Sequence, residues 1–301
     1  MCTRPPYEAL GPEAGRIQLY ARGRTRRIVT GLDGAGSDGR AKKPVMGARR
    51  LLVLDAGTCR LAESRVRRGG TDAQTVIPMP MFAIDTEDGW VLFDTGCDPR
   101  VVTDPEGTWG RLARAFQVEM TEDDHPLQRL RSIGVGASDV AHVVVSHLHM
   151  DHAGGLRFFP HSRIHVQKTE YRWALHPDKV AGAGFLRSDF DHPELTYELH
   201  EGDAEIVPGV HVVLTDGHTP GHQSLVVDLP VGRFLITGDA AYERRQLDRL
   251  VPPPVTTDDG AAVRSLARIR AFEVRDGATI LVNHDQKTWA SMRIVPDEEP
   301  T

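Results

Sequence analysis

The sequence predicts a mixed α/β fold, and three observations support this. Short apolar runs typical of strands alternate loosely with amphipathic helical segments from Arg50 onward. Several of these runs are joined by hairpin-like turns, which favours a mixed sandwich over a purely doubly wound parallel sheet. Hydrophobic residues make up 40% of the 301 residues and charged residues 26%, so the chain can bury a sizeable core.

The first strands are expected in the segment that opens the ordered region. Leu51–Leu54 is a short apolar run. Val76–Ile84 contains two prolines, and because proline has no N–H to donate, we expect an edge strand there. The turn Asp88-Gly89 then leads into Trp90–Asp94, which predicts a hairpin.

The rest of the core is predicted to combine helices with buried strands. Leu127–Ile133 is typical of a short amphipathic helix. Asp258-Asp259 can cap a longer helix with apolar positions every three or four residues, namely Val263, Leu266, Ile269, and Phe272 or Val274. The expected strands are Val143–Ser146, Ile164–Val166, Val212–Leu214, Leu225–Val227, Phe234–Thr237 and Ile280–Val282.

Residues 1–49 are expected to form a disordered basic extension. Residues 1–50 hold eleven Lys/Arg against four Asp/Glu, a net charge of +7, so the other 251 residues carry −13. This glycine-rich stretch cannot bury enough apolar surface to offset its chain entropy. We therefore expect one catalytic domain over 50–295 and a short tail over 296–301. A basic docking arm, or a true start at Met46, stays open.

Composition limits the compartment and the partners. The cysteines Cys2, Cys59 and Cys97 are scattered and form no CxxC pair, which favours a reducing cytoplasm. No apolar run approaches the ~20 residues of a membrane span, and no hydrophobic signal segment precedes a cleavage site. A net charge of −6 argues against nucleic acid as the main partner. A small-molecule partner is expected.

Metal-ligand residue types gather where apolar strands end. The run His147-Leu-His149-Met-Asp151-His152 follows Val143–Ser146 directly. Neutral imidazole and carboxylate suit zinc and other divalent metals, with cobalt, manganese and iron also acceptable. Further strand ends carry Gly217–His222, Gly238-Asp239 and Asn283–Asp285. This set is large enough for two metals that share a carboxylate and hold a bridging hydroxide as nucleophile.

The motifs HLHMDH, GHTPGH, GDA and NHD, in this order, resemble the metallo-β-lactamase superfamily over Arg50–Trp289. That resemblance implies an αββα sandwich with a dinuclear metal site at one sheet edge. Finer features are similar to the N-acyl-homoserine lactone lactonases, the quorum-quenching branch. These features are Asp239 with Tyr242 three residues on, and the runs Leu54–Gly57, Phe93–Cys97, His149–Gly154 and His284-Asp285.

The resemblance implies a role for each motif residue. The first ion would bind His147, His149 and His222. The second would bind Asp151, His152 and His284, and Asp239 would bridge both ions. Catalysis would involve Asp239, Tyr242 at the lactone carbonyl and Asp151 as proton donor to the leaving alkoxide. His218 falls outside the implied ligand set and is taken as a loop residue.

These roles predict ring opening of N-acyl-homoserine lactones by attack of the bridging hydroxide. A pyridoxolactone-like substrate, a glyoxalase II-like thioesterase activity and a catalytically silent metal-binding scaffold are the alternatives. The 62 residues after Asp239 hold one good helix, which disfavours the thioesterase. A homodimer is expected by analogy alone. Candidate apolar walls for the acyl chain are Met79, Met81, Trp109, Phe116 and Met150.

Overall fold

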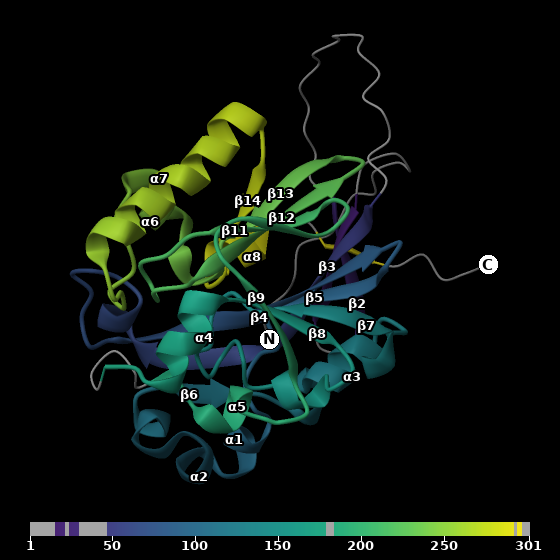
Figure 1. Ribbon diagram of the computed structural model, residues 1–301. Coiled ribbons are helices and arrows are strands. Elements are labelled where there is room, and N and C mark those ends of the chain that lie inside the picture. The colour runs from purple at the N-terminus through teal and green to yellow at the C-terminus, as the bar shows by residue number, and fades with distance from the viewer. Residues whose placement is uncertain (1–15, 22–23, 30–46, 179–183, 292–293, 297–301) are drawn as a thin grey trace, which may run out of the picture.

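The computed structural model describes residues 16–21, 24–29, 47–178, 184–291 and 294–296. Its fold is a sandwich of four layers. Two β-sheets face each other, and helices cover their outer faces (Figure 1). This arrangement confirms the expected αββα architecture. Among the described residues we find no helix with the length and hydropathy needed to cross a bilayer.

The larger sheet has 10 strands, and its central part carries the first metal-ligand motif. Strands β5, β7, β8 and β9 pair parallel with one another, whereas β4 pairs antiparallel with both β3 and β5. In spatial order the strands are β15 (Ile294–Pro296), β2 (Arg24–Val29), β1 (Arg16–Ala21), β3 (Ala48–Ala62), β4 (Gln74–Thr86), β5 (Gly89–Phe93), β7 (Val140–Val144), β8 (Arg163–Gln167) and β9 (Thr196–His200), with β6 (Gln117–Glu119) paired to β3.

The smaller sheet has five strands and carries the other motifs. All its neighbours pair antiparallel except the last two strands, which are parallel. The strands are β10 (Ala204–Val207), β11 (Val210–Leu214), β12 (Gln223–Leu229), β13 (Gly232–Ile236) and β14 (Thr279–Leu281). Because β7, β11, β13 and β14 all end at the same edge of the sandwich, the ligand-bearing loops meet there.

Helices lie against both outer faces. Leu130, Ala174 and Phe190 of α3, α4 and α5 pack on the larger sheet, whereas α6 and α7 pack on the smaller one. Figure 1 shows α6 and α7 together beside β13 and β14. The helices are α1 (Arg100–Thr103), α2 (Pro105–Trp109), α3 (Pro126–Arg131), α4 (Lys168–Leu175), α5 (Arg187–Phe190), α6 (Arg244–Arg249), α7 (Asp259–Asp276) and α8 (Gln286–Ser291).

The apolar runs of the sequence supply two core layers at once. Along β3, Leu51 and Val53 point between the sheets, whereas Leu52 and Leu54 point toward the helices. Successive side chains of a strand face opposite sides, so a strand covered on both faces must be apolar at every position. This explains why Leu51–Leu54 lacks the polar alternation of a half-exposed strand.

The expected edge strand Val76–Ile84 is wrong in position, because β4 lies between β3 and β5. Its prolines nevertheless avoid the two-sided part of the ladder. Pairing with β5 starts at Phe82, so Pro78 and Pro80 face only β3. The register of β3 also shifts opposite them, between Asp55 and Thr58. The missing N–H groups therefore break no ladder on the β5 side.

The predicted long helix is present as α7, and its cap is as expected. The Asp258 side chain accepts a hydrogen bond from the Ala261 N–H at 2.9 Å. Leu266 and Ile269 are buried, but Val263 and Val274 are 39% and 72% exposed, so these two are not core positions. The buried stripe runs through Ala262 instead, one position before Val263.

The predicted disordered extension contains two described strands, β1 and β2, and the first residues of β3. Strand β1 pairs parallel to β3 and antiparallel to β2, which in turn pairs with β15. The remaining residues of the extension, 1–15, 22–23 and 30–46, and the tail 297–301 lie outside the described residues. For those segments disorder stays a prediction.

Candidate metal centre

The first ligand loop is anchored where β5 and β7 end. Asp94 follows β5, and its Oδ1 accepts the Ser146 N–H at 2.7 Å while its Oδ2 accepts the Ser146 hydroxyl at 2.9 Å. Asp94 has a φ of 59°, a left-handed conformation that Asp tolerates better than most residues. These contacts hold the chain immediately before His147.

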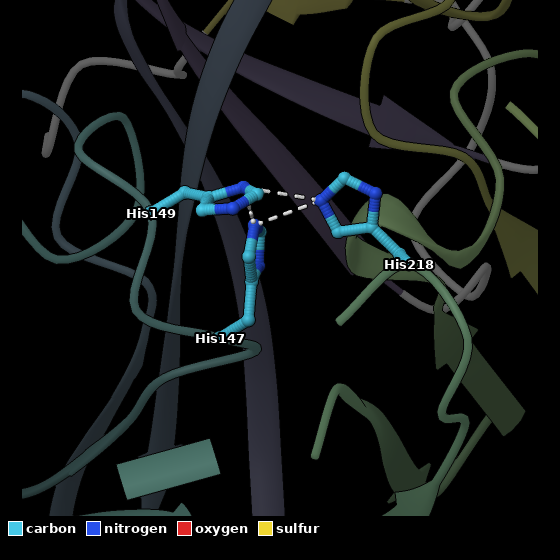
Figure 2. A group of neighbouring side chains, drawn as sticks. All are labelled: His147, His149 and His218. Carbon is cyan, nitrogen blue, oxygen red and sulfur yellow. Dashed lines mark hydrogen bonds between the residues drawn. The ribbon is translucent and has the colours of Figure 1, made fainter. Parts of the chain in front are cut away.

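Three imidazoles converge just beyond this anchor. His147 Nε2 lies 2.9 Å from His149 Nδ1, and His218 Nε2 lies 3.1 Å and 3.2 Å from the same two atoms (Figure 2). Burial lowers the pKa of His147 and His149 well below the usual range, so both rings are neutral. Three ring nitrogens this close cannot all carry protons, whereas a single cation can satisfy all three lone pairs.

A second group lies beside the first. Ligand-type atoms of Asp151, His152 and His284 fall within 4.8 Å of one another. His152 Nε2 is buried and makes no hydrogen bond of good geometry among the described residues, although Asp239 Oδ1 lies 3.2 Å away. A buried ring nitrogen without a hydrogen bond is costly unless something binds it. This orphaned atom and the imidazole–carboxylate donor set fit a zinc-type ion.

Asp239 stands between the two groups. Its Oδ2 lies 3.4 Å from His218 Nε2, and its Oδ1 lies 3.0 Å from His284 Nε2 and 3.2 Å from His152 Nε2. One oxygen therefore faces each group, as a bridging carboxylate requires. Burial opposes ionisation of Asp239, but the charges of His152 and His284 outweigh it and hold its pKa well below the usual range.

Each of three ligand-type rings is oriented from behind by an oxygen acceptor. The Nδ1 of His218 lies 2.7 Å from the Val255 carbonyl, and that of His284 lies 2.7 Å from the Pro78 carbonyl. The Nδ1 of His152 lies 2.8 Å from Asp94 Oδ2. Because carbonyl and carboxylate oxygens accept, each Nδ1 carries a proton and turns its Nε2 toward the centre.

His222 does not join either group, which corrects the expected ligand set. Its Nε2 accepts the Asp239 backbone N–H at 2.9 Å, and its Nδ1 lies 2.9 Å from the Thr215 hydroxyl. Both nitrogens are therefore used within the protein, and His218 occupies the place expected for His222. Gly238 is needed here, because a Cβ at its φ of 52° would come within 2.8 Å of His222 Nε2.

Tyr242 lies against the ligand rings. Its ring centroid is 5.1 Å from that of His284 and 5.9 Å from that of His218. The side chain is buried, and burial together with the Asp239 carboxylate raises its pKa well above the usual value. The phenol is therefore a proton-bearing donor throughout the physiological pH range.

A cavity of about 260 Å³ opens onto this centre. Asp151, Asp239 and Tyr242 are among its lining residues, and so are four of the five expected wall residues: Met79, Trp109, Phe116 and Met150. The fifth, Met81, is fully buried in the core between the larger sheet and the helices. Leu112, Val255 and Cys59 also line the cavity.

Two residues behind the ligands had no predicted role. Asp94 ends an apolar strand just as the ligand motifs do, and that position is the signal that could have identified it. Glu170 lies in the helical segment Lys168–Leu175, whose sequence is typical of a solvent-facing helix. Its side chain is nevertheless fully buried. Nothing in the local pattern indicates that burial.

Comparison with known proteins agrees with this geometry. The family model described as the metallo-beta-lactamase superfamily matches residues 80–284. N-acyl homoserine lactonase AttM of Azorhizobium caulinodans is 34% identical over 255 residues, covering 82% of this chain and 97% of the relative. N-acyl homoserine lactonase AiiA of Bacillus thuringiensis subsp. kurstaki is 34% identical over 256 residues, covering 84% and 99%.

Solved structures give the same result at the level of the fold. An N-acyl homoserine lactone hydrolase with the product N-hexanoyl-L-homoserine bound at its catalytic metal centre has a TM-score of 0.75 at 32% identity, covering 85% of this chain and 99% of that one. The matched family region contains every ligand-type residue of both groups. The chain therefore belongs to the metallo-β-lactamase superfamily.

Proposed function

We propose that this chain is a metal-dependent hydrolase that opens the ester ring of N-acyl-homoserine lactones to give N-acyl-homoserines. The observation that carries the proposal is Asp239, whose two oxygens face the two ligand groups beside Tyr242. The likeness to lactonases named for this substrate extends over four-fifths of the chain. One ion would be held by His147, His149 and His218, the other by Asp151, His152 and His284, with Asp239 shared.

Two divalent ions supply a nucleophile at neutral pH and Lewis-acid stabilisation of negative charge on the ester. The donor set favours Zn²⁺, and cobalt, manganese or iron would also fit. Loss of such ions should abolish turnover. Both described cysteines, Cys59 and Cys97, are free and buried, which supports a cytoplasmic location for the enzyme.

The residues of the chain divide the remaining work. Tyr242 keeps its proton and can donate a hydrogen bond to the carbonyl oxygen as negative charge develops there. Asp151 is the more accessible carboxylate, with its side chain 25% exposed against 4% for Asp239. It lies at the cavity and can carry a proton to the leaving alkoxide oxygen when the ring opens.

The apolar lining of the cavity suits the acyl chain. Met79, Trp109, Phe116 and Met150 present carbon and sulfur surface next to the polar centre. Transfer of a chain CH₂ group from water to such a surface contributes up to about 0.8 kcal/mol. A ligand with a polar ring and an apolar tail therefore matches both parts of the cavity.

The test is a substrate panel run with metal-loaded protein. Homoserine lactones of several acyl lengths, a pyridoxine-derived lactone, a glutathione thioester and a β-lactam are each followed by product chromatography. Opening of the homoserine lactones, with loss of activity after chelation and return after Zn²⁺ addition, is the expected result. Turnover of only the thioester, or of no substrate by protein with full metal content, would contradict the proposal.

A further inference from the structure

Glu170 connects the two loops that supply the three-histidine group. Its side chain on α4 is fully buried. Glu170 Oε1 accepts the Leu148 N–H at 3.1 Å, and Oε2 accepts the Gly221 N–H at 3.0 Å. Leu148 stands between His147 and His149, whereas Gly221 belongs to the loop of His218. One carboxylate therefore holds both loops, with one oxygen for each.

The backbone around this carboxylate is closely packed. A Cβ added at Gly221 would lie 2.3 Å from the Glu170 backbone nitrogen, so the loop and the start of α4 are in direct contact. A second tie joins the bases of the loops, where the Gln223 N–H donates to the Ser146 carbonyl at 2.9 Å. Glu170 acts nearer the imidazoles, because Leu148 stands in the chain between His147 and His149, whose rings are shown in Figure 2.

A packing role alone does not explain the residue type. Burying a carboxylate is unfavourable, and an apolar side chain of similar size would fill the space at lower cost. Burial raises the pKa of Glu170 to about 7, despite hydrogen bonds from the Leu148 and Gly221 N–H groups that lower it. What a carboxylate offers and an apolar group lacks is two acceptors aimed at two separate loops.

We propose that Glu170 is a positioning residue that sets the spacing between the two histidine loops and thereby the affinity of the three-histidine site. The backbone N–H groups that it binds lie next to His147 and His149 and in the loop of His218. Asp151 and His152 lie further along the first loop, and His284 lies on another loop. Removing one acceptor should therefore weaken one ion site selectively. The inference rests on the proposed metal centre and is independent of the lactone substrate.

The decisive variant is Glu170→Gln. Its amide keeps one oxygen acceptor but turns an NH₂ toward the other backbone N–H, so one loop is released while the side-chain volume is preserved. We expect weaker binding of one ion by about 10- to 100-fold, the range for residues that orient metal ligands. Binding of the other ion should be unchanged.

Metal affinity is measured directly, by titrating the apoprotein with Zn²⁺ in competition with a chelator and by Co²⁺ absorption spectra. His218→Ala identifies which ion is affected, because it removes a ring from the three-histidine group alone. In the double variant the Glu170→Gln change should add little to the loss already caused by His218→Ala. Additive losses, or equal weakening of both ions, would overturn the inference.

Asp124→Asn is the matched control, because Asp124 is a buried carboxylate in an ion pair with Arg129 and lies outside both ligand loops. It should lower Tm without changing either metal affinity. If Glu170→Gln likewise lowers Tm with both affinities at the wild-type value, Glu170 only packs. If Glu170→Gln does not fold, Glu170→Asp takes its place, and selective weakening of one ion supports the inference while equal weakening overturns it.

These readouts need no substrate, so they separate this inference from the proposed function. Protein that binds two ions normally but opens no lactone would contradict the function and leave the role of Glu170 intact. If the wild-type protein opens lactones but Glu170→Gln keeps both metal affinities, the proposed function stands and the role of Glu170 is contradicted.

Discussion

The two walls of the cavity are built by different means. The metal-ligand wall is formed by His149, Asp151 and Asp239. Behind it, His152, His218 and His284 are each held by an oxygen acceptor at 2.7 or 2.8 Å. On the apolar wall, Met79 and Met150 are held by packing in one hydrophobic cluster. Directional contacts fix where chemistry occurs, whereas packing contacts tolerate changes in shape. Substitutions should therefore cost most on the first wall and least on the second.

Asp239→Ala should have the largest effect, because it removes one oxygen from each ligand group at once. Two buried sites then lose a charge that offsets their cations. We expect kcat/KM to fall by about 1000-fold or more, equivalent to roughly 4 kcal/mol. Elemental analysis should show fewer than the ~2 ions per chain of a dinuclear centre. Full metal content with near-normal turnover would remove Asp239 from its bridging role.

Asp94→Asn tests orientation from behind the ligands. Asn also tolerates the left-handed backbone at this position, so the fold should be kept. The amide has one oxygen for contacts that the carboxylate shares between Ser146 and His152. Metal affinity and kcat/KM should fall by about 10- to 100-fold with a small change in Tm. A large Tm loss at unchanged metal affinity would instead show that Asp94 serves the fold.

Tyr242→Phe removes a single donor and leaves the ligands intact. A hydrogen-bond donor to an oxyanion contributes up to about 4 kcal/mol, but two cations would share the charge here. We expect a loss of roughly 1–2 kcal/mol, or about 5- to 30-fold in kcat/KM. The loss should be equal for short and long acyl chains, because the contact is to the ring ester. The measurement is kcat/KM of wild type and Tyr242→Phe for lactones of several acyl lengths, at matched metal content.

The sequence predicts the metal-ligand wall better than the rest of the molecule. His147, His149, Asp151 and His152 lie within six consecutive positions after a strand, so local geometry alone brings them together. Both His218 and His222 lie in the turn that follows one strand, so their position in the sequence does not show which of them faces the metal centre. Only the tertiary contacts of His222 with Thr215 and Asp239 show that its nitrogens are already used.

Other errors have the same origin, in contacts between distant segments. Periodicity could not distinguish Ala262 from Val263 as the buried position of α7, because they precede Leu266 by four and three residues and both spacings fit one helix face. The two prolines of β4 correctly indicate a stretch with only one neighbouring strand. The rest of β4 pairs with both β3 and β5, so the strand as a whole is not an edge strand. The acceptors behind the ligands, such as the Pro78 carbonyl, leave no signal because any residue supplies a carbonyl.

The smallest effect is expected on the apolar wall, at Arg65. Its guanidinium lies 5.2 Å from the centre of the Phe116 ring and lines the cavity. No hydrogen bond or ion pair within the described part of the chain reaches it. Two later arginines of the same loop are anchored, Arg67 to Glu243 and Arg68 to Asp259. The loop is thus fixed while Arg65 keeps a solvated charge beside the acyl chain.

Arg65→Met replaces that charge with a flexible apolar side chain of similar length. A long acyl chain would then cover apolar surface where it now meets a hydrated cation, a gain of roughly 0.5–1 kcal/mol. We expect KM for a decanoyl lactone to fall about 2- to 5-fold, with KM for a butanoyl lactone and both kcat values unchanged. Arg111→Met is the control, because Arg111 is exposed and absent from the cavity lining. An equal shift in KM at both chain lengths would mean that Arg65 acts on the ring end of the substrate, and the apolar wall would then share in positioning the ester.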